Sequence, residues 1–273
     1  RMGLSGEELR KKNPGLITST ISGYGDSGAA AKKKAYDFLI QAESGLCSVT
    51  GTAENPARVG VSLTDLSTGL TAFSAILRAL IQRGKTGLGI DLRISMFDVL
   101  ADWMNMPLMA HRYMGGAPAR SGLKHSFIAP YGAFGCGDGG QVLLSVQNNR
   151  EFAALCCDVL EQPDLSDDPR FAQNPERYVN RVALDTIVSA CFLQYDTPEV
   201  LAKLDAAHIA NAQLNSVADL SEHPFLRNTT AMIGGTEIEM AALPVQTDGG
   251  PTIDVPGLGE QSAALRLEFG REP

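Results

Sequence analysis

The sequence lacks the motifs by which several common classes of enzyme are recognised. Its five cysteines contain no C-x-x-C pair, so neither a disulfide framework nor a zinc site is indicated. The four histidines form no H-x-x-x-H or H-E-x-x-H motif, and no G-x-S-x-G is present. We therefore predict no metal site and no serine hydrolase.

Long apolar runs and positive charge are also scarce. No apolar run approaches the roughly 20 residues of a membrane span, and no charged segment followed by an apolar one opens the chain as in a secretory signal. The formal net charge of −8 argues against nucleic acid or an anionic membrane as a partner, because both require a basic surface. These absences predict a cytoplasmic protein with a small-molecule partner.

The 273 residues that are present suffice for one large domain or two smaller ones with a sizeable core. Ser5 and Glu8 have the spacing of a capping box and predict a short first helix. The β-branched stretch 16–22 predicts a buried strand. Residues 36–48 look helical, with Gly45 inside the segment.

The clearest helical pattern in the chain follows Ser62. Its apolar positions are Phe73, Ile76, Leu77, Leu80 and Ile81, and we expect this face to pack on a large core. Gly84 is placed to end the helix. A strand at 88–94 and another helix come next, so strand and helix alternate as in a parallel α/β unit.

A change of composition at residues 107–140, toward glycine, proline and polar side chains, predicts the boundary to a second domain. Further elements are expected as a strand at 141–146 and helices near 150–160, 179–192 and 198–206. From residue 236 onward the sequence predicts one short strand and an irregular tail.

A glycine turn with the pattern G-x-G-x-x-G lies at Gly23, Gly25 and Gly28, directly after the first predicted strand. A dinucleotide site would also need an acidic residue about 20 positions further on. Cys47, Ser48 and Val49 lie there instead. The glycines are better explained by a turn that needs positive φ or a close backbone approach.

Asp65 is the best candidate for a catalytic side chain. It lies in "VGVSLTDLSTGL", where Ser62 or Thr64 can cap the periodic helix. A carboxylate in a first helical turn is favoured by the helix dipole, and an ionised carboxylate needs no general base to act as a nucleophile. The alternative is that Asp65 is itself a capping residue.

A basic segment without acidic residues lies between Trp103 and Gly137 in this otherwise acidic chain. Its arginine, lysine and histidine side chains are His111, Arg112, Arg120, Lys124 and His125. They form either a surface for an anionic ligand or an ordinary solvated loop.

Six segments, in this order, resemble the family III CoA transferases. They are "NPGLITSTISGYGDSG", "AYDFLIQAESGLCSVTG", "VGVSLTDLSTGL", "KTGLGIDLRISMFDVL", "HSFIAPYGAF" and "PGLGEQS", and the resemblance covers nearly the whole chain. It implies an α/β fold: a Rossmann-like parallel-sheet domain with a second, smaller α+β domain. Residues 1–106 then belong to the large domain, whose N-terminal strands have no counterpart here. Residues 107–225 form the small domain, and 226–273 return toward the large one.

The resemblance also implies an acyl-CoA:carboxylate CoA-transferase that works through an aspartyl anhydride and an aspartyl-CoA thioester. The family's nucleophile matches Asp65. Lys34 and Tyr36 match positions that line the CoA site, and Gly23 and Gly25 lie beside them. No cofactor is implied beyond CoA or acyl-CoA as substrate. Family members form interlocked homodimers, so a homodimer is expected for the full-length protein.

The stretches "YDFLIQAESGL", "IAPYGAF" and "QNNREF" look most like family members that act on small dicarboxylates, such as mesaconyl-, itaconyl-, citramalyl- or succinyl-CoA. Arg120, Lys124 and His125 would suit the second carboxylate of such a substrate, because an unpaired buried charge is costly. Two alternatives stay open. A related α-methylacyl-CoA racemase needs a histidine where this chain has Tyr36, and a fragment of the family would keep the fold without turnover.

Overall fold

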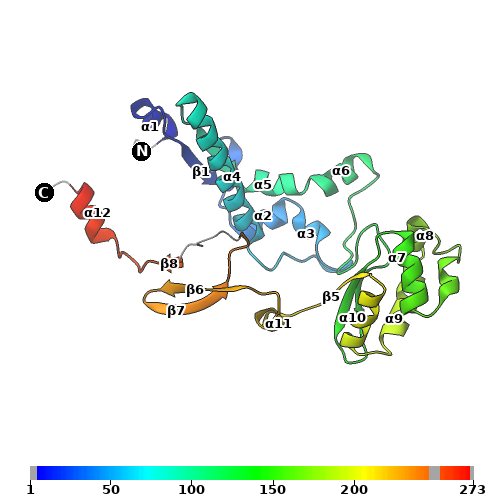
Figure 1. Ribbon diagram of the computed structural model, residues 1–273. Coiled ribbons are helices and arrows are strands. Elements are labelled where there is room, and N and C mark those ends of the chain that lie inside the picture. Colours follow the sequence, from blue (N-terminus) through cyan, green and yellow to red (C-terminus); the bar gives the residue numbers. More distant parts are fainter. Residues whose placement is uncertain (1–4, 246–252, 271–273) are drawn as a thin grey trace. The chain divides into compact units, whose positions relative to one another are not determined.

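The computed structural model describes residues 5–245 and 253–270, and the chain divides into two compact units after Gln213 (Figure 1). The predicted boundary at residues 106 and 107 lies inside the first unit. The division into segments 1–106, 107–225 and 226–273 stays a prediction.

Helices make up most of the regular structure of the first unit. In chain order they are α1 (Gly6–Lys12), η1 (Ala29–Lys32), α2 (Asp37–Glu43), α3 (Leu46–Val49), α4 (Leu63–Thr86), α5 (Met96–Trp103), α6 (Asn105–Tyr113), α7 (Asn149–Ala154), η2 (Leu155–Val159), η3 (Pro163–Ser166), α8 (Asn174–Val179), α9 (Arg181–Phe192) and α10 (Thr197–Ala206). Its strands are β1 (Thr18–Ser22), β2 (Asp91–Ser95), β3 (Tyr131–Gly135), β4 (Gln141–Ser145) and β5 (Ala210–Gln213).

Strands β1 and β2 pair in parallel, with Ile21 opposite Ile94, and the chain between them forms α2, α3 and α4. The predicted parallel α/β unit is therefore confirmed. The chain before β1 passes so close to the start of β2 that Gly89 has no room for a side chain. A Cβ there would lie 1.9 Å from the Leu16 carbonyl oxygen. The Gly89 amide meanwhile donates to the carbonyl of Pro14 at 2.8 Å.

Helix α4 is longer than the sequence predicts. It ends at Gly87, which adopts the left-handed conformation (φ 72°) and donates its amide to the Arg83 carbonyl at 2.7 Å. The predicted end at Gly84 is wrong, because the left-handed cap that terminates a helix forms three residues later.

The packing of α4 also differs from the expectation. Its buried residues are small or polar: Thr64, Ser67, Thr68, Ala72 and Ala79. Of the apolar stripe that we expected to be buried, Phe73, Leu77, Leu80 and Ile81 are exposed and Ile76 is only partly buried. Figure 1 shows α2 and α5 beside α4. The close approach of these helices is possible because small side chains face them.

Strands β3, β4 and β5 form an antiparallel sheet with β4 in the centre. Its core includes Phe134, Leu144, Phe152, Leu184 and Phe192, all buried, and the helices α7, α9 and α10 contribute to the same cluster. The predicted strand at 141–146 and the helices near 150–160, 179–192 and 198–206 are confirmed within a few residues. Strand β3 was missed because two of its five residues are glycine.

The second unit contains α11 (Val217–Ser221), β6 (Asn228–Ile233), β7 (Thr236–Ala241), β8 (Ile253–Val255) and α12 (Ser262–Phe269). Its sheet has the order β7-β6-β8, with β6 and β8 parallel. The predicted strand at 236 is confirmed as β7. The predicted irregular tail is wrong, because residues 262–269 form a helix whose sequence, SAALRLEF, favours one.

Candidate functional site

Asp65 lies in the first turn of α4, and its side chain is exposed. We expected Ser62 or Thr64 to cap this helix. Ser62 does occupy the N-cap position, but its side chain makes no capping hydrogen bond. The expectation is wrong because a carboxylate from another helix takes the free amides.

That carboxylate is Asp37, the first residue of α2. Its Oδ1 accepts the Thr64 amide at 2.7 Å and lies 3.4 Å from the Asp65 amide nitrogen. The Thr64 hydroxyl also donates to the Asp37 carbonyl at 3.2 Å. Asp37 therefore satisfies the unpaired amides at the start of α4, which every helix N-terminus presents.

Gln41, one turn further along α2, holds Asp37 in place. Its Nε2 donates to Asp37 Oδ2 at 2.8 Å, and its Oε1 accepts the Val59 amide at 2.9 Å. The side chain is fully buried, with 0% exposure. Sequence reasoning missed both residues. The only available signal was the four-residue spacing of Asp37 and Gln41, which places them on one face of a helix.

The Asp65 carboxylate does not cap α4. Among the described residues, no hydrogen bond or ion pair reaches its side-chain oxygens, while Asp37 does the capping. The alternative explanation of Asp65 as a capping residue is thus not what the structure shows. An exposed carboxylate on an anchored backbone has the accessibility that a nucleophile requires.

The glycine turn packs against the segment that leads into α2. A Cβ on Gly23 would lie 2.2 Å from the Cβ of Ala35, so only glycine allows this approach. Gly25 has a φ of 95° and donates its amide to the Ser22 hydroxyl at 3.0 Å. Ala35 stands between Lys34 and Tyr36 in the sequence. The structure therefore brings the turn and these two predicted CoA-site residues together.

Tyr36 connects this region to Asp65. It is the N-cap of α2, directly before Asp37, and its side chain is 70% exposed. Lys34 is exposed as well. The predicted residues Gly23, Lys34, Tyr36 and Asp65 thus lie in or beside the segments that meet where α2 and α4 begin.

A cluster of three side chains, of which Lys33 and Glu43 are exposed and Tyr24 is half-buried, lies in the same region. Glu43 accepts hydrogen bonds from Lys33 and from the Tyr24 hydroxyl, and the Lys33 ammonium lies 4.7 Å from the centre of the Tyr24 ring. The bonds from Lys33 and Tyr24 lower the pKa of Glu43. Lys33 is therefore already paired with Glu43. Its neighbour Lys34 is also exposed.

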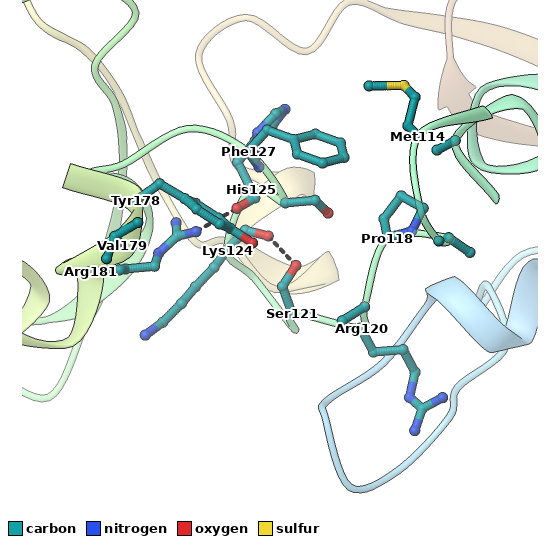
Figure 2. A pocket seen from close by; sticks show the side chains of 15 residues that line it. Met114, Pro118, Arg120, Ser121, Lys124, His125, Phe127, Tyr178, Val179 and Arg181 are labelled. Atoms are coloured by element: carbon teal, nitrogen blue, oxygen red, sulfur yellow. Dashed lines mark hydrogen bonds between the residues drawn. The ribbon is translucent and has the colours of Figure 1, made fainter. Parts of the chain in front are cut away.

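The basic segment lines a separate cavity of about 590 Å³, which includes Lys124, His125, Tyr178 and Arg181 (Figure 2). Asp65 is not among its lining residues. The Arg120 side chain points away from Tyr178 and His125 (Figure 2). Its guanidinium donates to the carbonyls of Thr52 and Ala53, both at 2.8 Å, and so fastens the loop before α4.

The remaining cations of this cavity share one carboxylate. Lys124 pairs with Asp185 at 2.6 Å, and the Arg181 Nε lies 3.7 Å from the same Asp185 oxygen. Arg181 also donates to the carbonyls of His125 and Tyr131. His125 stacks on Tyr131, with ring centres 4.9 Å apart. Two cations against one carboxylate leave this wall with a local excess of positive charge.

A sequence model described as CoA-transferase family III matches residues 1–262 of the chain. The chain belongs to this family. The resemblance that the six segments carry is therefore confirmed.

Relatives of this family III chain include two curated enzymes. It is 36% identical to an acetyl-CoA:oxalate CoA-transferase of Acetobacter aceti, over 98% of this chain and 70% of that protein. It is 35% identical to a succinyl-CoA:glutarate CoA-transferase of Mus musculus, over 85% of this chain and 53% of that protein. The chain thus spans between about half and 70% of the length of these relatives.

Solved structures agree with the family assignment and with the mixed α/β fold. A crystal structure of a CAIB/BAIF family protein from Brucella suis matches with a TM-score of 0.80 and 30% identity, over 97% of this chain and 71% of that one. Among the helices that the structure describes, none combines the length and the apolar content that a membrane span requires. The described residues also contain no group of three or more side chains suited to hold a metal ion.

Proposed function

We propose that this protein transfers CoA between carboxylic acids, with Asp65 as the nucleophile and small dicarboxylates as the acids. The observation that supports this most strongly is the Asp65 carboxylate. It is exposed in the first turn of α4, while Asp37 satisfies the helix amides in its place. The names of the two relatives, with oxalate and with succinyl-CoA and glutarate, support dicarboxylates as substrates.

The reaction proceeds in four exchanges at one carboxylate. Asp65 attacks the carbonyl carbon of the acyl-CoA, the C–S bond breaks, and a mixed anhydride and CoA thiolate result. The thiolate then attacks the aspartyl carbonyl of the anhydride, which releases the donor acid and leaves an Asp65-CoA thioester. Each step exchanges one acyl bond for another, so the difficult overall transfer is divided into easier ones.

The second half reverses the first with a new acid. The acceptor carboxylate attacks the Asp65-CoA thioester, giving a new anhydride and thiolate, and the thiolate attacks the acceptor's acyl carbon. The new acyl-CoA leaves and the Asp65 carboxylate is regenerated. No net proton transfer is needed, so this scheme requires no general base beside Asp65. Lys34, Tyr36 and the turn at Gly23 and Gly25 would hold CoA beside Asp65.

The basic cavity is the proposed place for the second carboxylate of the substrate. Lys124 and Arg181 share Asp185, and the resulting excess of positive charge would favour an anionic group. His125 lines the same cavity. Arg120 was predicted to bind substrate too, and it would do so only if it gave up its bonds to the loop carbonyls. The homodimer and the cytoplasmic location remain predictions alongside this assignment.

Trapping the acyl-enzyme tests the role of Asp65. We expect incubation with succinyl-CoA and hydroxylamine to convert Asp65 into a hydroxamate, because hydroxylamine attacks an aspartyl anhydride or thioester. Peptide mass spectrometry would locate the adduct. Asp65→Asn should give none, while Asp98→Asn should react like the unchanged protein, since Asp98 is another exposed first-turn aspartate, on α5.

The two alternatives give different results in the same experiment. Exchange of the substrate's α-proton in deuterated water, without any hydroxamate, would assign a racemase and contradict the transferase. An adduct at Asp98 instead of Asp65 would contradict Asp65 as the nucleophile. No adduct with succinyl-, acetyl- or oxalyl-CoA would also contradict it and would support a chain that keeps the fold without turnover.

A further inference from the structure

The start of α4 contains a local capping motif that the structure does not use. Ser62 and Asp65 have the S-x-x-D spacing of a capping box, in which the serine hydroxyl and the acidic side chain satisfy each other's backbone amides. Ser62 nevertheless makes no capping bond. If the box formed, the Asp65 carboxylate would be occupied by the amide of Ser62 and would no longer be free to attack a thioester.

Asp37 removes the need for the box by taking the helix amides itself, and Gln41 determines which way Asp37 points. With Oδ2 held by the Gln41 amide at 2.8 Å, Oδ1 is left to accept the Thr64 amide at 2.7 Å. Gln41 is fixed in turn by the Val59 amide from the loop before α4. Its burial means that no water competes for either bond.

We propose that Gln41 is a positioning residue for Asp65: by fixing Asp37 across the start of α4, it prevents the Ser62–Asp65 capping box and keeps the Asp65 carboxylate free. This inference rests on the proposed function for its catalytic consequence. Its structural part, the anchoring of the first turn of α4 by Gln41, does not depend on any activity.

The decisive comparison is between Gln41→Met and Thr68→Val. The methionine keeps most of the volume but loses both hydrogen bonds. Thr68 is a matched control, because it is buried near the start of α4 and donates a hydrogen bond to the Thr64 carbonyl at 2.7 Å, whereas the hydrogen bonds of Asp37 go to Gln41, Thr64 and Asp65. For Gln41→Met we expect the rate of hydroxamate formation at saturating succinyl-CoA to fall by about 10²-fold, the order that misplacement of a reacting group costs.

The KM of Gln41→Met for succinyl-CoA should change much less than its rate. Thr68→Val should keep its rate of hydroxamate formation even if its melting temperature drops as much as that of Gln41→Met. Adding Ser62→Ala to Gln41→Met should restore part of the lost rate, because the capping box then lacks one of its two hydrogen bonds. A role in stability alone predicts the opposite, a further loss. Equal rates for Gln41→Met and Thr68→Val, or no recovery with Ser62→Ala, would overturn the proposal.

Amide hydrogen exchange separates this proposal from the proposed function. In the peptides that contain Val59 and Thr64, Gln41→Met should accelerate exchange and Thr68→Val should not do so at Val59. If the unchanged protein forms no hydroxamate, the transferase assignment fails, and the exchange result still decides whether Gln41 anchors this turn. Unchanged exchange at Val59 and Thr64 in Gln41→Met would refute the anchoring itself.

Discussion

At the scale of single residues, Arg177 is the most deeply buried charge that the structure describes, with 1% exposure. Its guanidinium donates to the carbonyls of Ala129 and Phe171 and to the side chain of Asn149, at 2.9–3.0 Å. It also lies 4.4 Å from the centre of the Phe152 ring. Burial lowers the pKa of this guanidinium. Arg177 thereby fastens the loop before β3 to α8.

Replacing Arg177 by methionine should lower the free energy of unfolding by about 2–6 kcal/mol, because each of the two backbone acceptors left unsatisfied in the core costs about 1–3 kcal/mol. The two carbonyls would be left without their donor inside the core. Urea denaturation followed by circular dichroism would measure the loss. Arg170→Met is the control, because Arg170 is exposed and pairs with Asp168 at the surface, where such pairs contribute about 0–1 kcal/mol. Equal losses for both variants would contradict the structural role of Arg177.

The sequence predicted that Asp65 lies in a first helical turn, which the structure confirms, but it did not predict which residues surround it. The type of side chain and its place in a first turn were readable because both are local properties. Asp37 caps the helix from 27 positions away in the sequence, and no local pattern predicts such a contact. Arg120 shows the same limit. Its charge suggested a ligand, while its bonds to the loop around residue 52 depend on tertiary structure.

At the scale of elements, Asp138 links the β3–β4 turn to the start of α10. One carboxylate oxygen accepts the amide of Gly140 and the Thr197 hydroxyl, and the other accepts the Thr197 amide at 3.0 Å. These bonds lower the pKa of Asp138 below its ordinary value of 3.8, and the bond from the Thr197 amide has the largest effect. The two elements are thus joined by a carboxylate in its charged form.

The sign of the pH dependence follows from that shift. A carboxyl group with a depressed pKa in the folded state adds stability above its unfolded pKa, and this contribution disappears as the pH falls through the folded value. Asp138→Asn should therefore lower the urea midpoint at pH 6 and make less difference at pH 3. Urea titrations at both pH values would measure this. An equal or larger difference at pH 3 would show that the charge of Asp138 does not stabilise the link.

Helices and strands with a regular repeat of apolar residues could be predicted from the sequence. Their ends and the elements that they pack against could not. Helix α4 was visible from its apolar repeat, but the end at Gly87 instead of Gly84 depends on which glycine adopts the left-handed conformation. Helix α12 was missed where the proline- and glycine-rich stretch around residue 257 dominates the pattern. Strand β5, with the sequence ANAQ, has no strand signal and owes its existence to pairing with β4.

At the scale of the whole molecule, the two compact units differ in how much they bury. The first contains an extended core, whereas Ala231 is the only buried residue among those of the second unit whose burial is described. A small unit with so little buried surface has little stability of its own. The connection between the units, near residues 214–216, is exposed.

Limited proteolysis should therefore cut first near residues 214–216, because exposed connections between compact units are the preferred sites of nicking. The fragment up to that point should persist and the remainder should be digested further. Mass spectrometry of a time course would identify the fragments. Early cleavage inside β3, β4 or α9, with the connection intact, would contradict this division of the chain.

The α/β class and the family were predictable from the sequence, and the family model and the Brucella suis structure confirm both. The division after Gln213 was not. Composition changes at residues 107–140 suggested a boundary there, but a boundary between units depends on how few contacts cross it, which composition does not record. The irregular segment 114–127 instead lies within the first unit, where it lines the cavity beside α8 and α9.

The close approach at Gly89 limits how this sequence can diverge. Every single-base change that replaces a glycine codon by one for another amino acid adds a Cβ, and at this position the Cβ would meet the backbone oxygen of Leu16 at 1.9 Å. Backbone cannot move aside by changing rotamer, so no choice of side chain relieves the clash. Position 89 can therefore accept another residue during evolution only after, or together with, a shift of the chain at 14–16. Until the backbone shifts, selection should remove every substitution of Gly89.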